Sequence, residues 1–262
     1  MKRATPREIV RLLNRTPLIL MFDIDGTLCE IVEHAGDARI PSVAQAALRT
    51  LSGRSGHGTH VAFVTGRSAV DARRMVAVGG AVIYGNHGME RMSAAGTLDT
   101  SRGSETESSE LREAVRELAS VVAAFSGTSL EDKGLSLTLH FRAMDIAQLP
   151  DLNSRVANIA DRLALRLAQG KCVINVLPAG GATKGDAVLE IVHEIAGHSA
   201  GASILFAGDD VTDEDGFRTL RKIPGSVTVR VGSPNATSLA QFSLDGPRDV
   251  HELLSLLVTA RS

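Results

Sequence analysis

The stretch LILMFDIDGTLCE, residues 18–30, decides the fold of this chain. Its five large apolar residues, Leu18 to Phe22, predict a strand that is buried on both faces. Two aspartates, Asp23 and Asp25, follow at once, and a Gly-Thr pair closes the turn. Because two like charges beside a buried strand repel each other, a cation or retained protons must compensate them.

Short apolar runs alternate with helical patterns along much of the chain. Each run is continuous, which is typical of strands that are covered on both faces in a parallel sheet. The helical patterns include PSVAQAALRTL, which begins with Pro41, and KGDAVLEIVHEIAG, which ends on a glycine. This alternation predicts an α/β fold with a doubly wound, mainly parallel, Rossmann-like sheet. The predicted strands are 17–22, 60–64, 81–84, 203–207 and 226–231.

The middle of the chain has a different pattern. Residues 101–110 predict a loop, and an apolar face between residues 111 and 125 predicts a helix. Residues 135–142 alternate between apolar and polar types, which predicts a half-exposed strand. A second helix over about 153–168 and a strand over 171–178 follow.

These elements predict an α+β module inserted into the α/β core. We expect this module, a cap domain, to span residues 90–179. The core domain is then made of two parts, residues 1–89 and 180–262. At 262 residues the chain is long enough for both domains.

The composition excludes several classes of partner. The formal charge of −2 gives no basic excess for nucleic acid or an anionic membrane, and the absence of Trp argues against a base-stacking surface. Cys29 and Cys172 are the only cysteines, so neither a disulfide framework nor a zinc site is expected. The apolar run near the N-terminus is only about seven residues long, too short to span a membrane. We therefore expect a cytoplasmic protein with no membrane partner.

Polar residues follow the predicted strands, where the ligands of open parallel sheets bind. If these strand ends converge, their carboxylates require a cation, and oxygen ligands favour Mg²⁺. Asp209 and Asp213 would then complete a site begun by Asp23 and Asp25. The residues at the strand ends are Asp23, Asp25, Thr65, Gly66, Arg67, Lys184, Asp209, Asp210 and Asp213.

This set of residues could transfer a phosphoryl group. Asp23 would attack phosphorus and form an aspartyl-phosphate. Asp25 would protonate the departing alcohol oxygen and later take a proton from water. Lys184 and Thr65 would hold the phosphate oxygens, the lysine through its charge and the threonine through its hydroxyl group.

The motifs DIDGT, TGR, a lone Lys184 and GDDVTDED resemble, in this order, the four motifs of the haloacid dehalogenase superfamily of phosphotransferases. The insertion between the second and third motifs resembles the C2-type cap of that superfamily. The segments GNHGME (85–90), EDKGLSLTLHFR (131–142) and GDDVTDEDGF (208–217) resemble the trehalose-6-phosphate phosphatases. This resemblance implies that Asp23 is the nucleophile and that Asp25 is the acid and base. It also implies that Mg²⁺ is held by Asp23, the Asp25 backbone carbonyl and Asp209.

The resemblance also implies where a sugar would bind. His140 and Arg142 share the strand face of Ser136, so substrate binding and a solvated sheet face both stay open for these two residues. The predicted substrate-binding residues are Gly66, Arg67, Asn86, His87, Gly88, Lys133, Ser136, His140, Arg142 and Asn175.

One segment departs from the pattern of that family. Such phosphatases carry a Glu-Ile-Arg-Pro-like segment before the third motif, and its glutamate contacts the disaccharide. Here the segment is NVLP, with Asn175 in place of the glutamate and Leu177 in place of the arginine. An amide can bond a sugar hydroxyl, but without the charge that strengthens such a bond. Trehalose 6-phosphate is the expected substrate, and phosphorylated glucosylglycerol, glucosylglycerate or sucrose are alternatives.

A catalytically silent regulator that binds a sugar phosphate or a synthase is an alternative of a different class. Such a protein would be expected to lack one of the chemical groups, and all of them are present here. We therefore predict a phosphatase that acts on a small-molecule sugar phosphate with Mg²⁺ as its cofactor. A glycosyltransferase synthase of the same pathway is a further expected partner.

Overall fold

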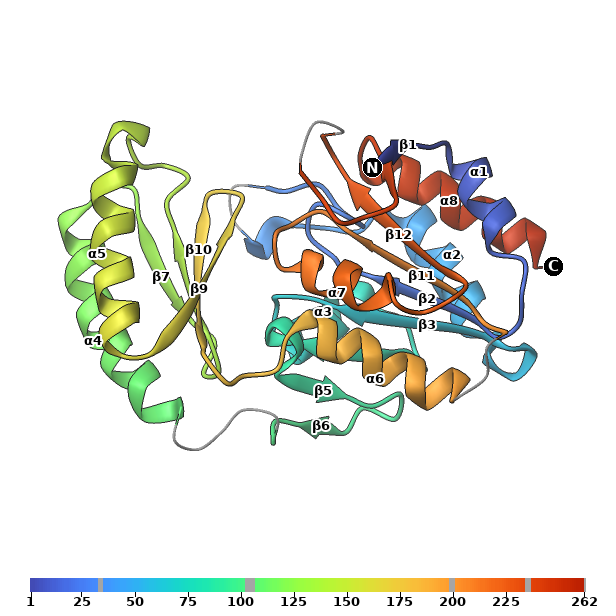
Figure 1. Cartoon of the computed structure of the whole chain (residues 1–262), viewed down its shortest axis with the longest axis horizontal. Helices are drawn as coiled ribbons and strands as arrows, with labels where there is room; N and C mark the ends of the chain where they lie inside the picture. Colours follow the sequence, from blue (N-terminus) through green and yellow to red (C-terminus); the bar gives the residue numbers. More distant parts are fainter. Residues whose placement is uncertain (33–34, 102–106, 198–200, 234–236, 262) are drawn as a thin grey trace. The chain divides into compact units, whose positions relative to one another are not determined.

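The computed structural model describes residues 1–32, 35–101, 107–197, 201–233 and 237–261 (Figure 1). The chain divides into two compact units, and the first combines Met1–Asp99 with Thr183–Ser262. The second unit is Thr100–Ala182. These boundaries differ from the predicted 90–179, because residues 90–99 pair with the sheet of the first unit.

The first unit contains a nine-stranded sheet in the order β1-β13-β12-β11-β2-β3-β4-β5-β6. Neighbouring strands from β1 to β4 in this order are parallel, and β5 and β6 are antiparallel. The strands are β1 (Lys2–Arg3), β2 (Leu18–Phe22), β3 (Thr59–Val64), β4 (Val82–Gly85), β5 (Glu90–Met92), β6 (Leu98–Asp99), β11 (Ser203–Gly208), β12 (Ser226–Val231) and β13 (Phe242–Leu244).

Helices cover both faces of this sheet, as a doubly wound fold requires. Along β2, Leu18, Leu20 and Phe22 pack in a core with α1, α2, α3 and α8. Ile19 and Met21 pack on the opposite face with α6 and α7. The predicted burial of this strand on both faces is confirmed. The helices are α1 (Pro6–Leu12), α2 (Ser42–Ser52), α3 (Ala69–Val76), α6 (Lys184–Ala196), α7 (Asp213–Leu220) and α8 (Pro247–Ala260).

The strand order reverses between β2 and β11. The chain runs from β2 outward through β3 and β4, then returns to β11 on the other side of β2 and continues to β12. In open α/β sheets, ligands bind outside the carboxyl ends of the strands at such a reversal. The backbone pairing continues past the strand, since the Asp23 N–H donates to the Ala207 carbonyl at 2.9 Å. The aspartates that follow β2 and β11 therefore lie at the same edge.

The second unit has a four-stranded antiparallel sheet in the order β7-β8-β10-β9 (Figure 1). The two helices α4 and α5 cover one face and pack against residues such as Leu137, Leu139 and Ile174. Because side chains alternate along a strand, Thr138 and Asn175 lie on the opposite face. The elements are α4 (Glu107–Ala124), β7 (Ser129–Asp132), β8 (Leu137–His140), α5 (Leu149–Arg162), β9 (Leu165–Gly170) and β10 (Val173–Pro178). The short 3₁₀ helices of the chain are η1 (Ala35–Asp37), η2 (Ser55–His57), η3 (Asn86–Gly88) and η4 (Ile146–Gln148).

Two predictions for this region are wrong in part. The predicted helix over about 153–168 ends at Arg162, because Ala164 has a φ of +50° and residues 165–170 pair with β10 as a strand. Of the predicted loop at 101–110, residues 107–110 belong to α4, and residues 102–106 lie outside the described residues.

The prediction of a half-exposed strand at 135–142 needs a correction. Leu137 and Leu139 lie in the apolar core, as the alternation predicts. Ser136 and Thr138 are buried rather than exposed. Thr138 is satisfied by its neighbour, since its Oγ1 donates to Asn175 Oδ1 at 3.0 Å. A buried hydroxyl can therefore occupy the polar side of this strand without an unmet hydrogen bond.

Candidate active site

Lys184 joins two aspartates at the beginning of α6. Its Nζ donates to Asp23 Oδ1 at 3.0 Å and to Asp213 Oδ1 at 2.8 Å, and all three side chains are buried. Burial alone would lower the pKa of Lys184, but the two carboxylates outweigh it and raise that pKa above its ordinary value. The helix begins at this residue because Thr183 and Asp186 form a capping box. The ammonium group therefore stays charged at a fixed position.

Three buried carboxylates converge beside this lysine. Oxygens of Asp23, Asp209 and Asp213 lie within 4.8 Å of one another. Burial first, and then the charges of Asp213 and Asp209, raise the pKa of Asp23 well above its ordinary value, although Lys184 opposes this shift. A Cβ atom on Gly26 would lie 2.1 Å from Asp209 Oδ2, so only glycine allows this approach. Three buried carboxylates beside one ammonium group leave an excess of negative charge, which a divalent cation bound by carboxylate oxygens would compensate.

Asp213 contacts the lysine and also holds the segment between β11 and α7. Its second oxygen, Oδ2, accepts from the Asp210 N–H at 2.9 Å. A Cβ atom on Gly208 would lie 2.2 Å from Asp213 Cγ, so the chain passes very close to this carboxylate. Both oxygens of Asp213 are therefore hydrogen-bonded, unlike those of a carboxylate that faces an ion alone. Burial and Asp213 also raise the pKa of Asp210.

Arg67 holds the Asp25 carboxylate through two bonds. Its Nε lies 2.7 Å from Asp25 Oδ2, and its Nη2 lies 2.7 Å from Asp25 Oδ1. Its Nη1 donates to Asp71 Oδ2 at 2.8 Å. The guanidinium group of Arg67 thus contacts two carboxylates, and its predicted contact with the substrate stays a prediction. The Asp25 side chain is also outside the three-carboxylate cluster, so only its backbone carbonyl is suited to the metal site.

Cys29 lies near Asp25, with 3.8 Å between Cys29 Sγ and Asp25 Oδ1, but its thiol is not suited to act as a nucleophile. Burial, and then the charge of Asp25, raise the pKa of the Cys29 thiol to about 12. The thiol is therefore protonated at neutral pH, whereas a thiolate is needed for nucleophilic attack.

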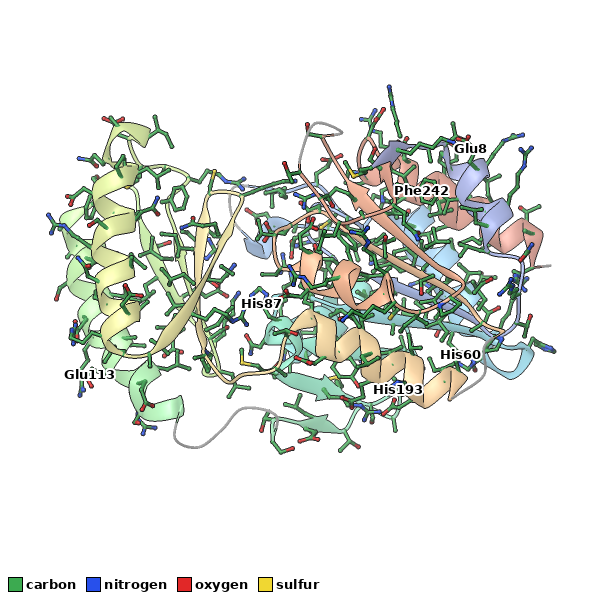
Figure 2. The ribbon with its side chains drawn as sticks, viewed as in Figure 1. Glu8, His60, His87, Glu113, His193 and Phe242 are labelled. Carbon is green, nitrogen blue, oxygen red and sulfur yellow. The ribbon has the colours of Figure 1, made fainter. Side chains whose placement is uncertain are left out.

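The turns that follow β3 and β4 form one unit. The His87 N–H donates to the Thr65 carbonyl at 2.9 Å, and the Asn86 N–H donates to the Arg67 carbonyl at 2.7 Å. A Cβ atom on Gly66 would lie 2.7 Å from the His87 ring, so glycine is required there. Figure 2 shows His87 near the N-terminal end of α6. Thr65 and His87, both predicted from the sequence, are thus fixed relative to each other.

Asn86 is held inside the protein. It is fully buried, and its Nδ2 donates to Glu90 Oε1 at 2.7 Å. Glu90 Oε2 also accepts from the Ala69 N–H, at 2.6 Å. The side chain of Asn86 thus helps to hold the turn, and its contact with a sugar stays a prediction. Sequence reasoning missed Glu90, although the residue lies inside the GNHGME segment. Gly88 ends the same turn. A Cβ atom on this residue would lie 2.4 Å from the Thr183 carbonyl oxygen.

The remaining predicted residues belong to the second unit. Glu131, which sequence reasoning missed, is 2.9 Å from His140 Nε2 and 3.8 Å from Lys133 Nζ. Ser136 is buried, and Arg142 lies beyond the end of β8 and is exposed. Lys133 and His140 are thus oriented by one carboxylate. A role of these residues in substrate binding stays a prediction.

Comparison with known proteins supports the resemblance. A family model described as trehalose-phosphatase matches residues 21–248. The chain is 30% identical over 249 residues to trehalose-6-phosphate phosphatase of Escherichia coli, and the match covers 91% of this chain and 86% of that protein. It is 29% identical to trehalose-phosphate phosphatase of Mycobacterium tuberculosis, over 94% of this chain and 62% of that protein. The structure of the C-terminal domain of trehalose-6-phosphate phosphatase from C. albicans shares the fold, with a TM-score of 0.88 and 22% identity over 100% of this chain and 99% of that one.

Proposed function

The chain belongs to the trehalose-phosphatase family and is a phosphoric monoester hydrolase, and we propose that it hydrolyses trehalose 6-phosphate to trehalose and phosphate. The observation that carries this proposal is the contact between Asp23 and Lys184 inside the cluster of buried carboxylates. A carboxylate can attack phosphorus only where the charge of the phosphate is compensated. The ammonium group and a divalent cation would supply that compensation.

The proposed reaction has two steps. In the first, Asp23 Oδ2 attacks phosphorus while its Oδ1 accepts from Lys184, the bond from phosphorus to the sugar oxygen breaks, and Asp25 protonates that oxygen. In the second, Asp25 takes a proton from water, the water attacks the aspartyl-phosphate, and phosphate leaves. Lys184 and Thr65 bind the phosphate oxygens in both steps. Arg67 would orient Asp25 for both proton transfers, since it bonds each carboxylate oxygen once and leaves a further lone pair on each.

We propose Mg²⁺ as the cofactor. Asp23, Asp209 and the Asp25 carbonyl would hold the ion, because these groups offer hard oxygen ligands at the same edge of the sheet. Asp213 would orient the site through Lys184 and the Asp210 N–H rather than bind directly. When bound, the ion compensates the negative charge on the phosphate.

We also propose that the second unit contributes contacts to the sugar. Lys133, Ser136, His140 and Arg142 stay the candidates, together with Asn175 on the face of its sheet opposite α4 and α5. The Oδ1 atom of Asn175 accepts from Thr138, which leaves Nδ2 to donate to a sugar oxygen. In the first unit, the candidates for substrate binding are Gly66, His87 and Gly88, which the family resemblance suggests. A cytoplasmic location and a synthase partner stay predictions.

A panel of substrates tests the proposed function. Phosphate release would be measured with Mg²⁺ from trehalose 6-phosphate and from the phosphates of sucrose, glucosylglycerol and glucosylglycerate. We expect the highest kcat/KM for trehalose 6-phosphate. A higher kcat/KM for another sugar phosphate would identify that compound as the preferred substrate, and the protein would still be a phosphatase. No release from any of them by a folded protein would favour the silent regulator.

Replacing Asn175 by glutamate is expected to lower the KM for trehalose 6-phosphate about tenfold, because a carboxylate makes stronger hydrogen bonds to hydroxyl groups than an amide does. The measurement is KM and kcat for this substrate. Hydrolysis of p-nitrophenyl phosphate, which has no sugar, serves as the control and should be unchanged. If the KM for the sugar phosphate is unaltered, Asn175 does not take part in substrate recognition.

A further inference from the structure

An ion pair outside the proposed chemistry holds the segment that carries Asp209. Glu214, in the first turn of α7, meets Arg230, at the end of β12, with 2.9 Å between Oε1 and Nη1. The other carboxylate oxygen of Glu214 accepts from the Leu239 N–H at 2.7 Å. Arg230 Nη1 also donates to the Asp210 carbonyl at 3.3 Å. Only 16% of the Glu214 side chain and 12% of the Arg230 side chain are exposed.

These contacts act on residues 208–214, which we call the metal loop. Both backbone groups of Asp210 are hydrogen-bonded. Its N–H donates to Asp213, and its carbonyl accepts from Arg230. The Asp210 N–H belongs to the peptide group that follows Asp209. The orientation of that peptide group limits the directions in which the Asp209 side chain can leave the backbone.

The guanidinium group of Arg230 also has to be kept in its place. Its Nε is buried and has no hydrogen-bond partner among the residues that the structure describes. A largely buried arginine that loses its carboxylate partner becomes an unpaired charge, which is strongly unfavourable. The metal loop lies beside this guanidinium group, because the Asp210 carbonyl oxygen is 3.3 Å from Arg230 Nη1, so the acidic side chains of the loop would be available as partners. Glu214 thus keeps a positive charge from competing for the carboxylates that would bind an ion.

We propose that Glu214 and Arg230 are positioning residues for the divalent metal ion. They hold the metal loop so that Asp209 keeps its ligating direction, and they do not touch the substrate or the reacting atoms. The inference rests on the metal site of the proposed function. It requires that a change in the pair weakens metal binding while the chemical step survives once the metal is bound.

The test compares Glu214→Gln, Arg230→Met and the double variant with the unchanged protein. Mg²⁺ binding would be measured by calorimetry without substrate, and the dependence of phosphate release on Mg²⁺ concentration would be measured separately. Loss of a residue that orients a metal ligand typically weakens metal affinity about 10–100-fold, and we expect that range here. We also expect kcat to recover at saturating Mg²⁺. The double variant should lose less than the two single losses combined, because both remove the same interaction.

A neighbouring ion pair on α7 provides a matched control. Arg218 lies 2.8 Å from Asp215, and both side chains are more exposed than those of Glu214 and Arg230. Asp215→Asn and Arg218→Met should leave Mg²⁺ affinity unchanged, because exposed pairs contribute little. Arg230→Lys, which keeps the charge, should give an intermediate affinity and replaces Arg230→Met if that variant fails to fold.

The outcomes separate this inference from the proposed function. If the unchanged protein binds Mg²⁺ and the Glu214 and Arg230 variants bind it equally well, the positioning role is wrong. The same holds if their kcat stays low at saturating Mg²⁺. If the unchanged protein binds no Mg²⁺, the metal site of the proposed function fails instead.

Discussion

Replacing Asp23 by asparagine is expected to lower kcat for phosphate release by at least about a thousandfold. An amide oxygen is a poor nucleophile, so no aspartyl-phosphate can form at this position. The measurement is phosphate release at saturating Mg²⁺ and substrate, with circular dichroism to check the fold. Asp215→Asn, which changes an aspartate outside the cluster, is the control and should keep its activity. A variant with near-normal kcat would remove Asp23 from the role of nucleophile.

The same substitution should not destabilise the metal-free protein at neutral pH. The pKa of Asp23 is raised by burial and by Asp213 and Asp209. A carboxylate whose pKa is higher in the folded state holds its proton more tightly there, so stability falls as pH rises from its ordinary pKa toward the raised value. Asparagine removes this loss of stability. The free energy of unfolding, measured in urea without Mg²⁺, should therefore be at least as large in the variant as in the unchanged protein.

The sequence predicts well the edge of the sheet at which the acidic residues gather, because the signals there are local. Continuous apolar runs such as Leu18–Phe22 mark strands buried on both faces, and the polar residues directly after them must lie at the carboxyl ends. The approach of Asp23 to Asp209 follows from this topology, because β2 and β11 are neighbouring parallel strands. The second unit was predicted less well. The run from 165 to 170 is short and alternates between apolar and polar residues only at its beginning, so that its pairing with β10 is what makes it a strand.

The residues that hold the site could not be predicted from local patterns. Glu90 and Arg230 are ordinary charged residues in their own segments, and their roles depend on which backbone atoms the fold brings near them. The contacts of Arg67 with Asp25 and Asp71 were not predicted, and its contact with the substrate stays a prediction. The TGR motif indicates a turn at the end of a strand. The two bonds from Arg67 to Asp25 depend instead on the distance between the turns that follow β2 and β3, which the motif does not encode.

Replacing Lys184 by methionine is expected to lower the free energy of unfolding by about 3–5 kcal/mol at pH 7.5 without Mg²⁺, because breaking a buried ion pair leaves its other charges uncompensated. Here Asp23 and Asp213 both lose their cation, and each is buried. Urea unfolding curves give the value. Lys222→Met, at an exposed lysine of the same unit, is the control and should change stability by less than about 0.5 kcal/mol.

The dependence of this loss on pH and on metal tests its cause. Without the lysine, the pKa of Asp23, which burial already raises, rises further, so the folded variant takes up a proton as pH falls, and its deficit should shrink between pH 7.5 and 5. Mg²⁺ should also restore part of the stability, because it binds the folded cluster and not the unfolded chain. Activity should stay absent even when stability is restored, since the ion would replace the charge of Lys184 but not the contact with phosphate that we propose for this lysine. A deficit that is independent of both pH and Mg²⁺ would trace the loss to packing, and the lysine would no longer explain how Asp23 can be ionised inside the protein.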